Sequence, residues 1–184
     1  MPTAQRLSSR SPRTKTARQR ELTTKRRGEL AEVAFTHRAV RLGFAISKPY
    51  SDSQRYDFIL DSGTALYRVQ IKSTSTLLNG LYHVNSHRRT GGGTVPYLPS
   101  EVDFLIAYII PEDAWFILPI DLVAARTSLL FNPKNYYRDP GLYGDYREAW
   151  DLLREPRQCA SCGHSVPTRS CGSSAGCRSP VGFV

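Results

Sequence analysis

The sequence has no long hydrophobic run. Its longest uninterrupted apolar segment, residues 104–110, contains seven residues, whereas a membrane-spanning helix needs roughly 20. This excludes a transmembrane helix. Residues 1–27 also lack the apolar block of a secretory signal, because only scattered Ala and Leu stand among their basic and polar side chains. We therefore expect a cytoplasmic protein that has no membrane partner.

Cysteine is absent from the long central part of the chain, and charge is unevenly distributed around it. All four cysteines lie between Cys159 and Cys177. Residues 1–27 carry nine Lys or Arg and one acid, a net +8; residues 28–155 carry thirteen against fifteen, a net −2; residues 156–184 carry three Arg and no acid, a net +3. A length of 184 residues fits one ordinary domain. We expect that domain at 28–155, between a basic arm and a tail rich in Cys, Ser and Gly.

The basic arm, residues 1–27, has few apolar side chains. It cannot bury enough surface to offset the entropy of ordering, so we expect it to be disordered. Three roles remain open for it. A flexible basic arm can bind nucleic-acid phosphates without sequence choice, or it can be a solvated linker. An Arg-rich and Ser-rich start that is poor in acids is also typical of an organellar transit peptide.

The periodicity of apolar residues predicts an α/β domain that begins with a helix. A stripe at helical spacing that includes Leu30 and Val33 predicts a helix over residues 28–42, which ends at Gly43. The apolar run at 102–110 is typical of a central strand covered on both faces. The remaining predicted elements are strands at 55–60, 66–73, 81–85 and 115–118, a loop at 86–100, and a helix with an apolar packing face at 143–154.

The first two predicted strands form a hairpin with one polar face. Because alternate side chains of a strand point to the same face, Asp57, Gln70 and Lys72 can lie together, and either Glu29 or Glu32 of the preceding helix can reach them. This set suits metal-assisted phosphodiester hydrolysis, since Mg²⁺ prefers oxygen ligands and a Lys stabilises developing negative charge. Judged by spacing alone, however, a half-exposed hairpin with ordinary polar residues is a more common explanation of this pattern than a metal site.

Three short segments carry a resemblance to a known family. They read Gly-Glu-Leu-Ala-Glu at 28–32, Arg-Tyr-Asp-Phe-Ile at 55–59 and Tyr-Arg-Val-Gln-Ile-Lys-Ser at 67–73. In order and spacing they resemble the PD-(D/E)XK nuclease superfamily, in particular its branch of group I intron homing endonucleases, over about residues 28–154. The resemblance implies a restriction-endonuclease-like α/β core, with a mixed sheet flanked by helices, and a Mg²⁺-dependent endonuclease whose partner is DNA.

The resemblance also assigns roles to particular residues. Glu32 matches the acid on the helix, Asp57 the metal-bridging acid, Gln70 the (D/E) position and Lys72 the lysine of the motif. The implied Mg²⁺ ligands are therefore Glu32, Asp57 and Gln70, and Lys72 completes the catalytic set by assisting the attacking water. The register of the helix favours Glu32 over its neighbour Glu29.

The sequence departs from the family motif at two positions. Tyr56 stands where the motif has Pro, which does not affect metal ligation. Gln70 replaces a carboxylate, and a neutral amide oxygen binds a divalent cation more weakly, although Gln is found here in the intron-encoded branch. A catalytically inactive DNA-binding module on the same fold is therefore the alternative to a nuclease. DNA targets with two-fold symmetry would favour a symmetric homo-oligomer in either case.

The tail contains a candidate zinc site of four thiols. They are Cys159, Cys162, Cys171 and Cys177. Four thiolates in two clusters can enclose a tetrahedral Zn²⁺. However, the second pair is not a C-x2-C knuckle, and almost no apolar residue supports a metal fold. A reduced, disordered tail is therefore the favoured interpretation, and disulfides are a weak third. The last functional alternative is a basic zinc protein in which the two terminal tails, and not the central domain, bind the partner.

Overall fold

The computed structural model describes residues 23–51 and 53–155, and its centre is a five-stranded sheet. The strand order is β1-β2-β3-β8-β9, with bounds Ala45–Ser47, Phe58–Asp61, Leu66–Thr74, Phe104–Ile109 and Ala114–Pro119. β3 and β8 are parallel, and the other neighbours are antiparallel. All six residues of β8 are buried, as expected of a central strand. The predicted α/β architecture with a mixed sheet is confirmed.

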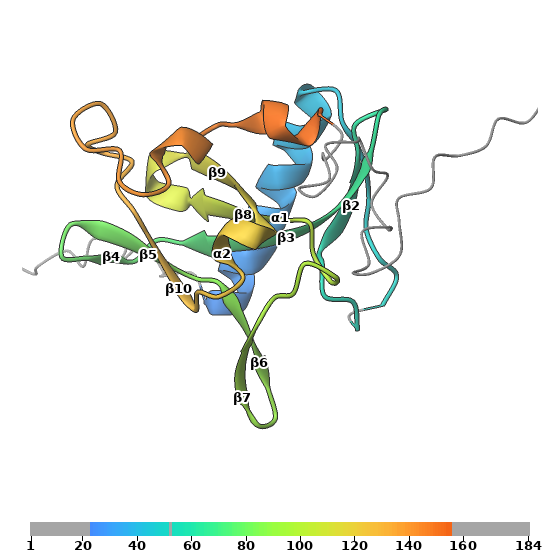
Figure 1. Cartoon of the computed structure of the whole chain (residues 1–184), viewed down its shortest axis with the longest axis horizontal. Helices are drawn as coiled ribbons and strands as arrows, with labels where there is room; N and C mark the ends of the chain where they lie inside the picture. Colours follow the sequence, from blue (N-terminus) through green and yellow to red (C-terminus); the bar gives the residue numbers. More distant parts are fainter. Residues whose placement is uncertain (1–22, 52, 156–184) are drawn as a thin grey trace, which may run out of the picture.

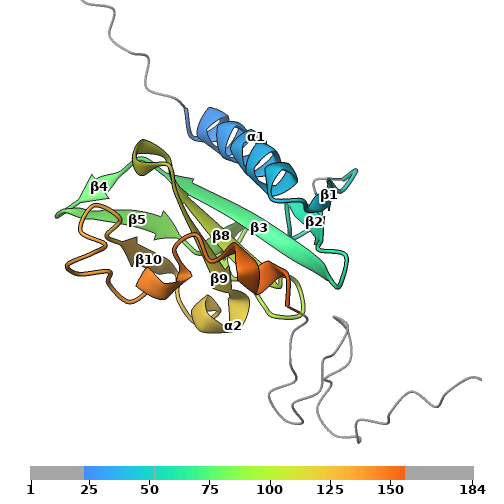
Figure 2. The ribbon, with the colours of Figure 1, turned by 90° about the horizontal axis from the view of Figure 1, so that it is seen from above.

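Helix α1 (Thr24–Arg41) lies across one face of this sheet (Figure 2). Its start is fixed by Thr23, whose hydroxyl oxygen accepts a hydrogen bond of 3.3 Å from the backbone N–H of Arg26. The helix therefore begins four residues before the predicted residue 28. Residues 24–27, which we had assigned to the basic arm, form its first turn.

The face that α1 buries differs from the predicted one. Its buried residues are Ala31, Phe35 and Ala39, spaced four apart, while Leu30 and Val33 are exposed. The small side chains of the two alanines allow a close approach to the sheet, where Phe35 packs against other aromatic rings. The helix face that packs on the sheet therefore contains Ala31, Phe35 and Ala39. The adjacent face carries Glu29 and Glu32, which line a hollow together with Lys48 and Phe58.

The other face of the sheet is covered by α2 (Ile120–Val123) and by a small second sheet (Figure 2). That sheet has the order β10-β5-β4, with bounds Ser128–Phe131, Leu81–Asn85 and Leu77–Leu78. The predicted strand at 81–85 is therefore present as β5. Two hydrophobic clusters result, one on each face of the central sheet, and residues of β8 alternate between them. The central strands are thus fixed from both sides.

Residues 86–100 were predicted to be a loop, but most of them form a two-stranded ribbon. β6 (His87–Thr90) pairs antiparallel with β7 (Gly93–Pro96). Gly93 adopts a φ of 137°, which an L side chain rarely adopts, and it allows the tight reversal after Gly91 and Gly92. The ribbon projects from the body of the protein (Figure 1).

The predicted helix over 143–154 is wrong. The structure has two short 3₁₀ helices there, η2 (Gly144–Tyr146) and η3 (Trp150–Leu153). They are separated by Glu148, which has a left-handed φ of 53° and whose backbone N–H donates to the carbonyl of Trp115. This β-type contact replaces the helical hydrogen bonds. The apolar side chains of the segment are nevertheless buried as predicted, because the two 3₁₀ turns still present Trp150 and Leu153 to the core.

Two predicted regions lie outside the residues that the structure describes. They are the basic arm as far as residue 22 and the tail from residue 156, which includes the candidate zinc ligands Cys159, Cys162, Cys171 and Cys177. Within the described ranges, no helix is both long enough and apolar enough to cross a membrane.

Candidate active site

The site is built where β2 begins beside the middle of β3. Phe58 pairs with Val69, so the preceding residue, Asp57, lies opposite Gln70. Oδ2 of Asp57 accepts two hydrogen bonds, one of 2.7 Å from the backbone N–H of Ile71 and one of 2.6 Å from Nε2 of Gln70. The Asp57 carboxylate therefore completes the backbone pairing of β3 at the point where β2 starts.

Gln70 holds Asp57 in place through its amide nitrogen. Besides its bond to Asp57, Nε2 of Gln70 donates to the backbone carbonyl of Ile71 at 3.2 Å. The residue is buried, with 8% of its surface exposed. Within the described ranges, no hydrogen bond to Oε1 of Gln70 is found. The amide oxygen is therefore the atom of Gln70 that remains for a ligand, which is the atom a hard cation requires.

Lys72 lies two residues beyond Gln70 and on the same face of β3. Its Nζ is 5.2 Å from the centroid of the ring of Tyr97, a buried residue that follows β7. Such a cation–π contact holds the ammonium group without neutralising its charge. The predicted polar face of Asp57, Gln70 and Lys72 is thus present in the structure.

Burial raises the pKa of the Asp57 carboxyl above its usual value. The backbone N–H of Ile71 opposes this rise, the nearby negative charge of Glu32 adds to it, and Lys72 and Gln70 oppose it. The pKa of Asp57 remains raised in sum. The two carboxylates therefore lie close enough to repel one another across the site, and a cation bound between them would offset both the repulsion and the loss of solvation.

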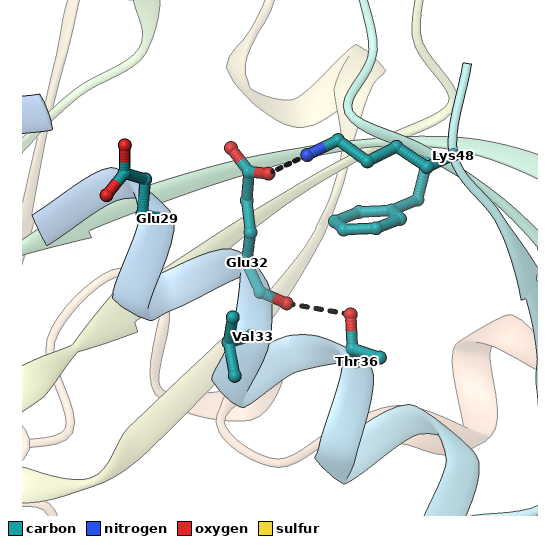
Figure 3. Close-up of a pocket in the computed structure, with 6 residues that line it drawn as sticks. Glu29, Glu32, Val33, Thr36 and Lys48 are labelled. Carbon is teal, nitrogen blue, oxygen red and sulfur yellow. Dashed lines mark hydrogen bonds and ion pairs between the residues drawn. The ribbon is translucent and has the colours of Figure 1, made fainter. Parts of the chain in front are cut away.

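Glu32 is the acid of α1 that acts on Asp57, and it points to Lys48 (Figure 3). Oε2 of Glu32 is 2.6 Å from Nζ of Lys48. Glu29 is on the preceding turn and lines the same hollow of about 330 Å³, but Figure 3 shows its carboxylate turned away from Lys48. Glu29 is also not among the groups that shift the pKa of Asp57. Of these two acids, Glu32 is therefore the one whose charge acts on Asp57, and its role as a metal ligand stays a prediction.

Sequence reasoning missed one charged member of this site, Lys48. Its Nζ contacts Glu32 and lies 5.8 Å from the centroid of the Phe58 ring. The only signal in the sequence is a single Lys between a short apolar run and Pro49, which does not indicate a partner 16 residues earlier. Within the described ranges, no three His, Cys, Asp or Glu side chains form a metal-binding group. The site thus has two carboxylates and an amide where a motif with three acids would have three carboxylates.

A mixed α/β fold that carries two carboxylates, an amide and a lysine at one site is typical of metal-dependent hydrolases. Comparison with known proteins identifies the family. Residues 22–153 match the PD-(D/E)XK endonuclease family. The chain belongs to this family, and the predicted family is confirmed.

Among solved structures, the chain is similar to a bacterial homing endonuclease, I-Ssp6803I. The TM-score is 0.64 and the identity 28%, over 72% of this chain and 94% of that one. A weaker similarity, to MepB, has a TM-score of 0.36 and 14% identity over 60% of this chain and 83% of that one, and supports no argument. A comparison with curated proteins finds no match. The family and the homing-endonuclease neighbour support nuclease function for this chain.

Proposed function

We propose that this protein is a Mg²⁺-dependent DNA endonuclease in which Glu32, Asp57 and Gln70 bind the metal and Lys72 assists hydrolysis. The observation that supports this most directly is the shared face of Asp57, Gln70 and Lys72, with the Glu32 carboxylate acting on Asp57. The homing-endonuclease neighbour supports DNA as the substrate.

The donor atoms of the site fit Mg²⁺. Two carboxylates and an amide oxygen are hard ligands, and Mg²⁺ is typically held by one or two carboxylates plus substrate phosphate and water. The raised pKa of Asp57 is a second indication of fit, because a divalent cation would stabilise the ionised carboxylate that burial and Glu32 disfavour. When bound, the metal lowers the pKa of water and offsets charge on the scissile phosphate.

The residues of the chain supply the remaining parts of the reaction. Gln70 fixes the Asp57 carboxylate through Nε2, and the backbone N–H of Ile71 fixes the same oxygen from the strand. Lys72 can donate hydrogen bonds from Nζ to a non-bridging phosphate oxygen and to the attacking water, which stabilises the negative charge that develops on the phosphate. Gln70, Ile71 and Lys72 lie on β3, and Asp57 directly precedes β2 and is hydrogen-bonded to β3, so little reorganisation is needed before reaction.

Nicking of supercoiled plasmid tests the proposal. The full chain should nick plasmid in Mg²⁺ and not in EDTA, and Asp57→Ala should abolish nicking while DNA binding in Ca²⁺ survives. Asp61→Asn is a matched control, because it removes an exposed carboxylate at the far end of β2, the strand that Asp57 precedes. Nicking in EDTA, or nicking by Asp57→Ala at the wild-type rate, would refute this assignment.

A second candidate function rests on the amide at position 70. With Gln in place of a carboxylate, the site has one formal charge fewer for a divalent cation, which favours a DNA-binding module without catalysis. The plasmid experiment separates the two candidates, since wild-type protein that binds DNA in Ca²⁺ but never nicks it in Mg²⁺ or Mn²⁺ supports the binding module. Self-association on DNA, as a symmetric homo-oligomer, is compatible with both.

A further inference from the structure

A second hollow, distinct from the one beside Glu32, starts at Lys72. Its volume is about 430 Å³. The charged and titratable side chains that line it are all basic or imidazole groups, and its other lining residues are Thr, Ser and Asn. They are Arg27, Lys72, His83, His87, Arg88 and Arg89. We call this hollow the basic cleft, and none of the described residues that line it is an acid.

The basic cleft gathers its basic side chains from four separate elements. Arg27 comes from the first turn of α1, Lys72 from β3, His83 from β5, and Arg88 and Arg89 from the stem of the β6–β7 ribbon. Residues 23–155 carry sixteen Lys or Arg and fifteen acids, a net charge of +1, so this concentration is not a consequence of a generally basic surface. Positive charge has been collected at one place, next to the lysine of the active site.

Arg27 is positioned without being neutralised. Its Nη1 donates to Oγ of Ser75 at 3.1 Å and its Nη2 to Oγ1 of Thr24 at 3.3 Å. Its backbone carbonyl accepts a hydrogen bond of 3.4 Å from Oγ of Ser73, which ties the start of α1 to β3. Hydroxyl partners orient the guanidinium group but leave its charge intact, and a guanidinium fork matches the geometry of a phosphate.

The two arginines of the ribbon complete the cleft. Arg88 makes one ion pair, with Glu101 at 3.3 Å, and its buried Nε has no hydrogen-bond partner among the described residues. Arg89 is exposed, and within the described ranges no ion pair or side-chain hydrogen bond is found for it. The ring of His87 is held at the base of the ribbon by a contact of 2.8 Å between Nδ1 and the carbonyl of Thr127. Arg88 is thus paired with an acid, whereas Arg27 and Arg89 present charge that no acid among the described residues pairs with.

We propose that the basic cleft binds the backbone phosphates that neighbour the scissile phosphate on the cut strand, with Arg27 and Arg89 as direct phosphate contacts. This inference rests on the proposed function, because Lys72 belongs both to the cleft and to the catalytic face. In this arrangement the scissile phosphate lies at Lys72, and the DNA backbone continues from there between α1 and the ribbon. The ribbon then lies along the duplex, where it projects from the body of the protein (Figure 1).

The salt dependence of DNA binding tests this proposal. Binding of the full chain to a duplex of arbitrary sequence is measured in Ca²⁺ over a range of salt concentrations for the wild type, Arg27→Ala and Arg89→Ala. Each lost phosphate contact should reduce the slope of log K against log salt by roughly 0.9. Arg41→Ala is the matched control, because it removes the same charge from an exposed position at the other end of α1.

Four results are decisive. A reduced slope in Arg27→Ala and Arg89→Ala but not in Arg41→Ala, with the slope restored in Arg89→Lys, supports the cleft. Unchanged slopes, or equal losses in all three alanine variants, overturn it, as does tighter competition by an acidic peptide than by DNA. Thermal unfolding followed by circular dichroism shows that each variant is folded, and the exposed Arg89 gives a reading even if Arg27→Ala is unstable. No cleavage is needed, so a failure of plasmid nicking is distinguishable from a failure of this inference.

Discussion

Asp57 is both a candidate metal ligand and the hydrogen-bond acceptor that completes the backbone pairing of β3. Because of these two roles, we expect two different substitutions of Asp57 to change the free energy of unfolding in opposite directions. Asp57→Ala removes the acceptor and leaves the backbone N–H of Ile71 without its partner, which costs about 1–3 kcal/mol. Asp57→Asn retains an oxygen that can accept this bond and removes a charge that burial disfavours. In EDTA at neutral pH, we expect the unfolding free energy to be highest for Asp57→Asn, lower for the wild type and lowest for Asp57→Ala.

The dependence of this difference on pH follows from the direction of the pKa shift. The folded-state pKa of Asp57 is raised, so the ionised group costs stability at neutral pH, and this cost disappears as the carboxyl is protonated. The advantage of Asn over Asp should therefore shrink as the pH falls through the raised pKa. It should be absent below the ordinary value of 3.8.

Urea unfolding in EDTA and in Mg²⁺ measures both parts of the prediction. A bound ion at 100 times its dissociation constant stabilises the folded state by about 2.7 kcal/mol. Mg²⁺ should therefore stabilise the wild type and neither variant, which reverses the order of the wild type and Asp57→Asn. If Asp57→Asn is less stable than Asp57→Ala in EDTA, or if Mg²⁺ stabilises Asp57→Asn as much as the wild type, the reasoning is refuted.

The remaining predictions concern catalysis, the buried ion pair that Arg68 forms with Asp103 at 3.0 Å, and the basic arm. Lys72→Ala should abolish Mg²⁺-dependent plasmid nicking yet keep DNA binding in Ca²⁺, and normal nicking would exclude it from the reaction. Gln70→Glu should lower the Mg²⁺ concentration for half-maximal nicking, because it adds a charge to the ligand set; an unshifted titration of an active variant would count against ligation by Gln70. Asp103→Ala should reduce the unfolding free energy in urea by about 3–5 kcal/mol, because it removes the 4% exposed carboxylate that pairs with Arg68 and leaves that 18% exposed side chain with backbone carbonyls alone. A much smaller loss would show that the pair is not stabilising. Removing residues 1–22, which carry six Lys or Arg and one acid, should flatten the salt slope of DNA binding without moving the cleavage position. An unchanged slope would mean that the arm is a linker or a targeting peptide.

The sequence predicted those parts of the fold in which a short, local pattern decides the structure. The alternation in 66–73 predicted which side chains of β3 face the core, and the apolar run at 102–110 predicted the buried β8. The helix over 143–154 failed because its helical spacing is met equally by two 3₁₀ turns. What separates them is a tertiary hydrogen bond from Glu148 to Trp115, which no local pattern contains.

The candidate site shows the same division. The polar face of Asp57, Gln70 and Lys72 follows from strand alternation, and the structure places the three residues as expected. The partnership of Glu32 with Lys48 and the assembly of the basic cleft could not be predicted, because they join residues whose proximity depends on how α1 and the ribbon pack. Arg27 is the clearest example, since the sequence placed it in a flexible arm and the structure anchors it to Ser75.

The ion pair between Glu32 and Lys48 gives the proposed metal site an internal counter-ion. The two carboxylates, Glu32 and Asp57, repel one another, and the ammonium group of Lys48 partly compensates for this charge when no metal is bound. The side chains of Lys48 and Glu32 are 63% and 28% exposed, so the pair contributes only about 0–1 kcal/mol and is displaced at little cost. If Glu32 and Asp57 bind a metal ion as proposed, that ion would replace the ammonium group of Lys48 as the partner of Glu32, at a site that is already assembled.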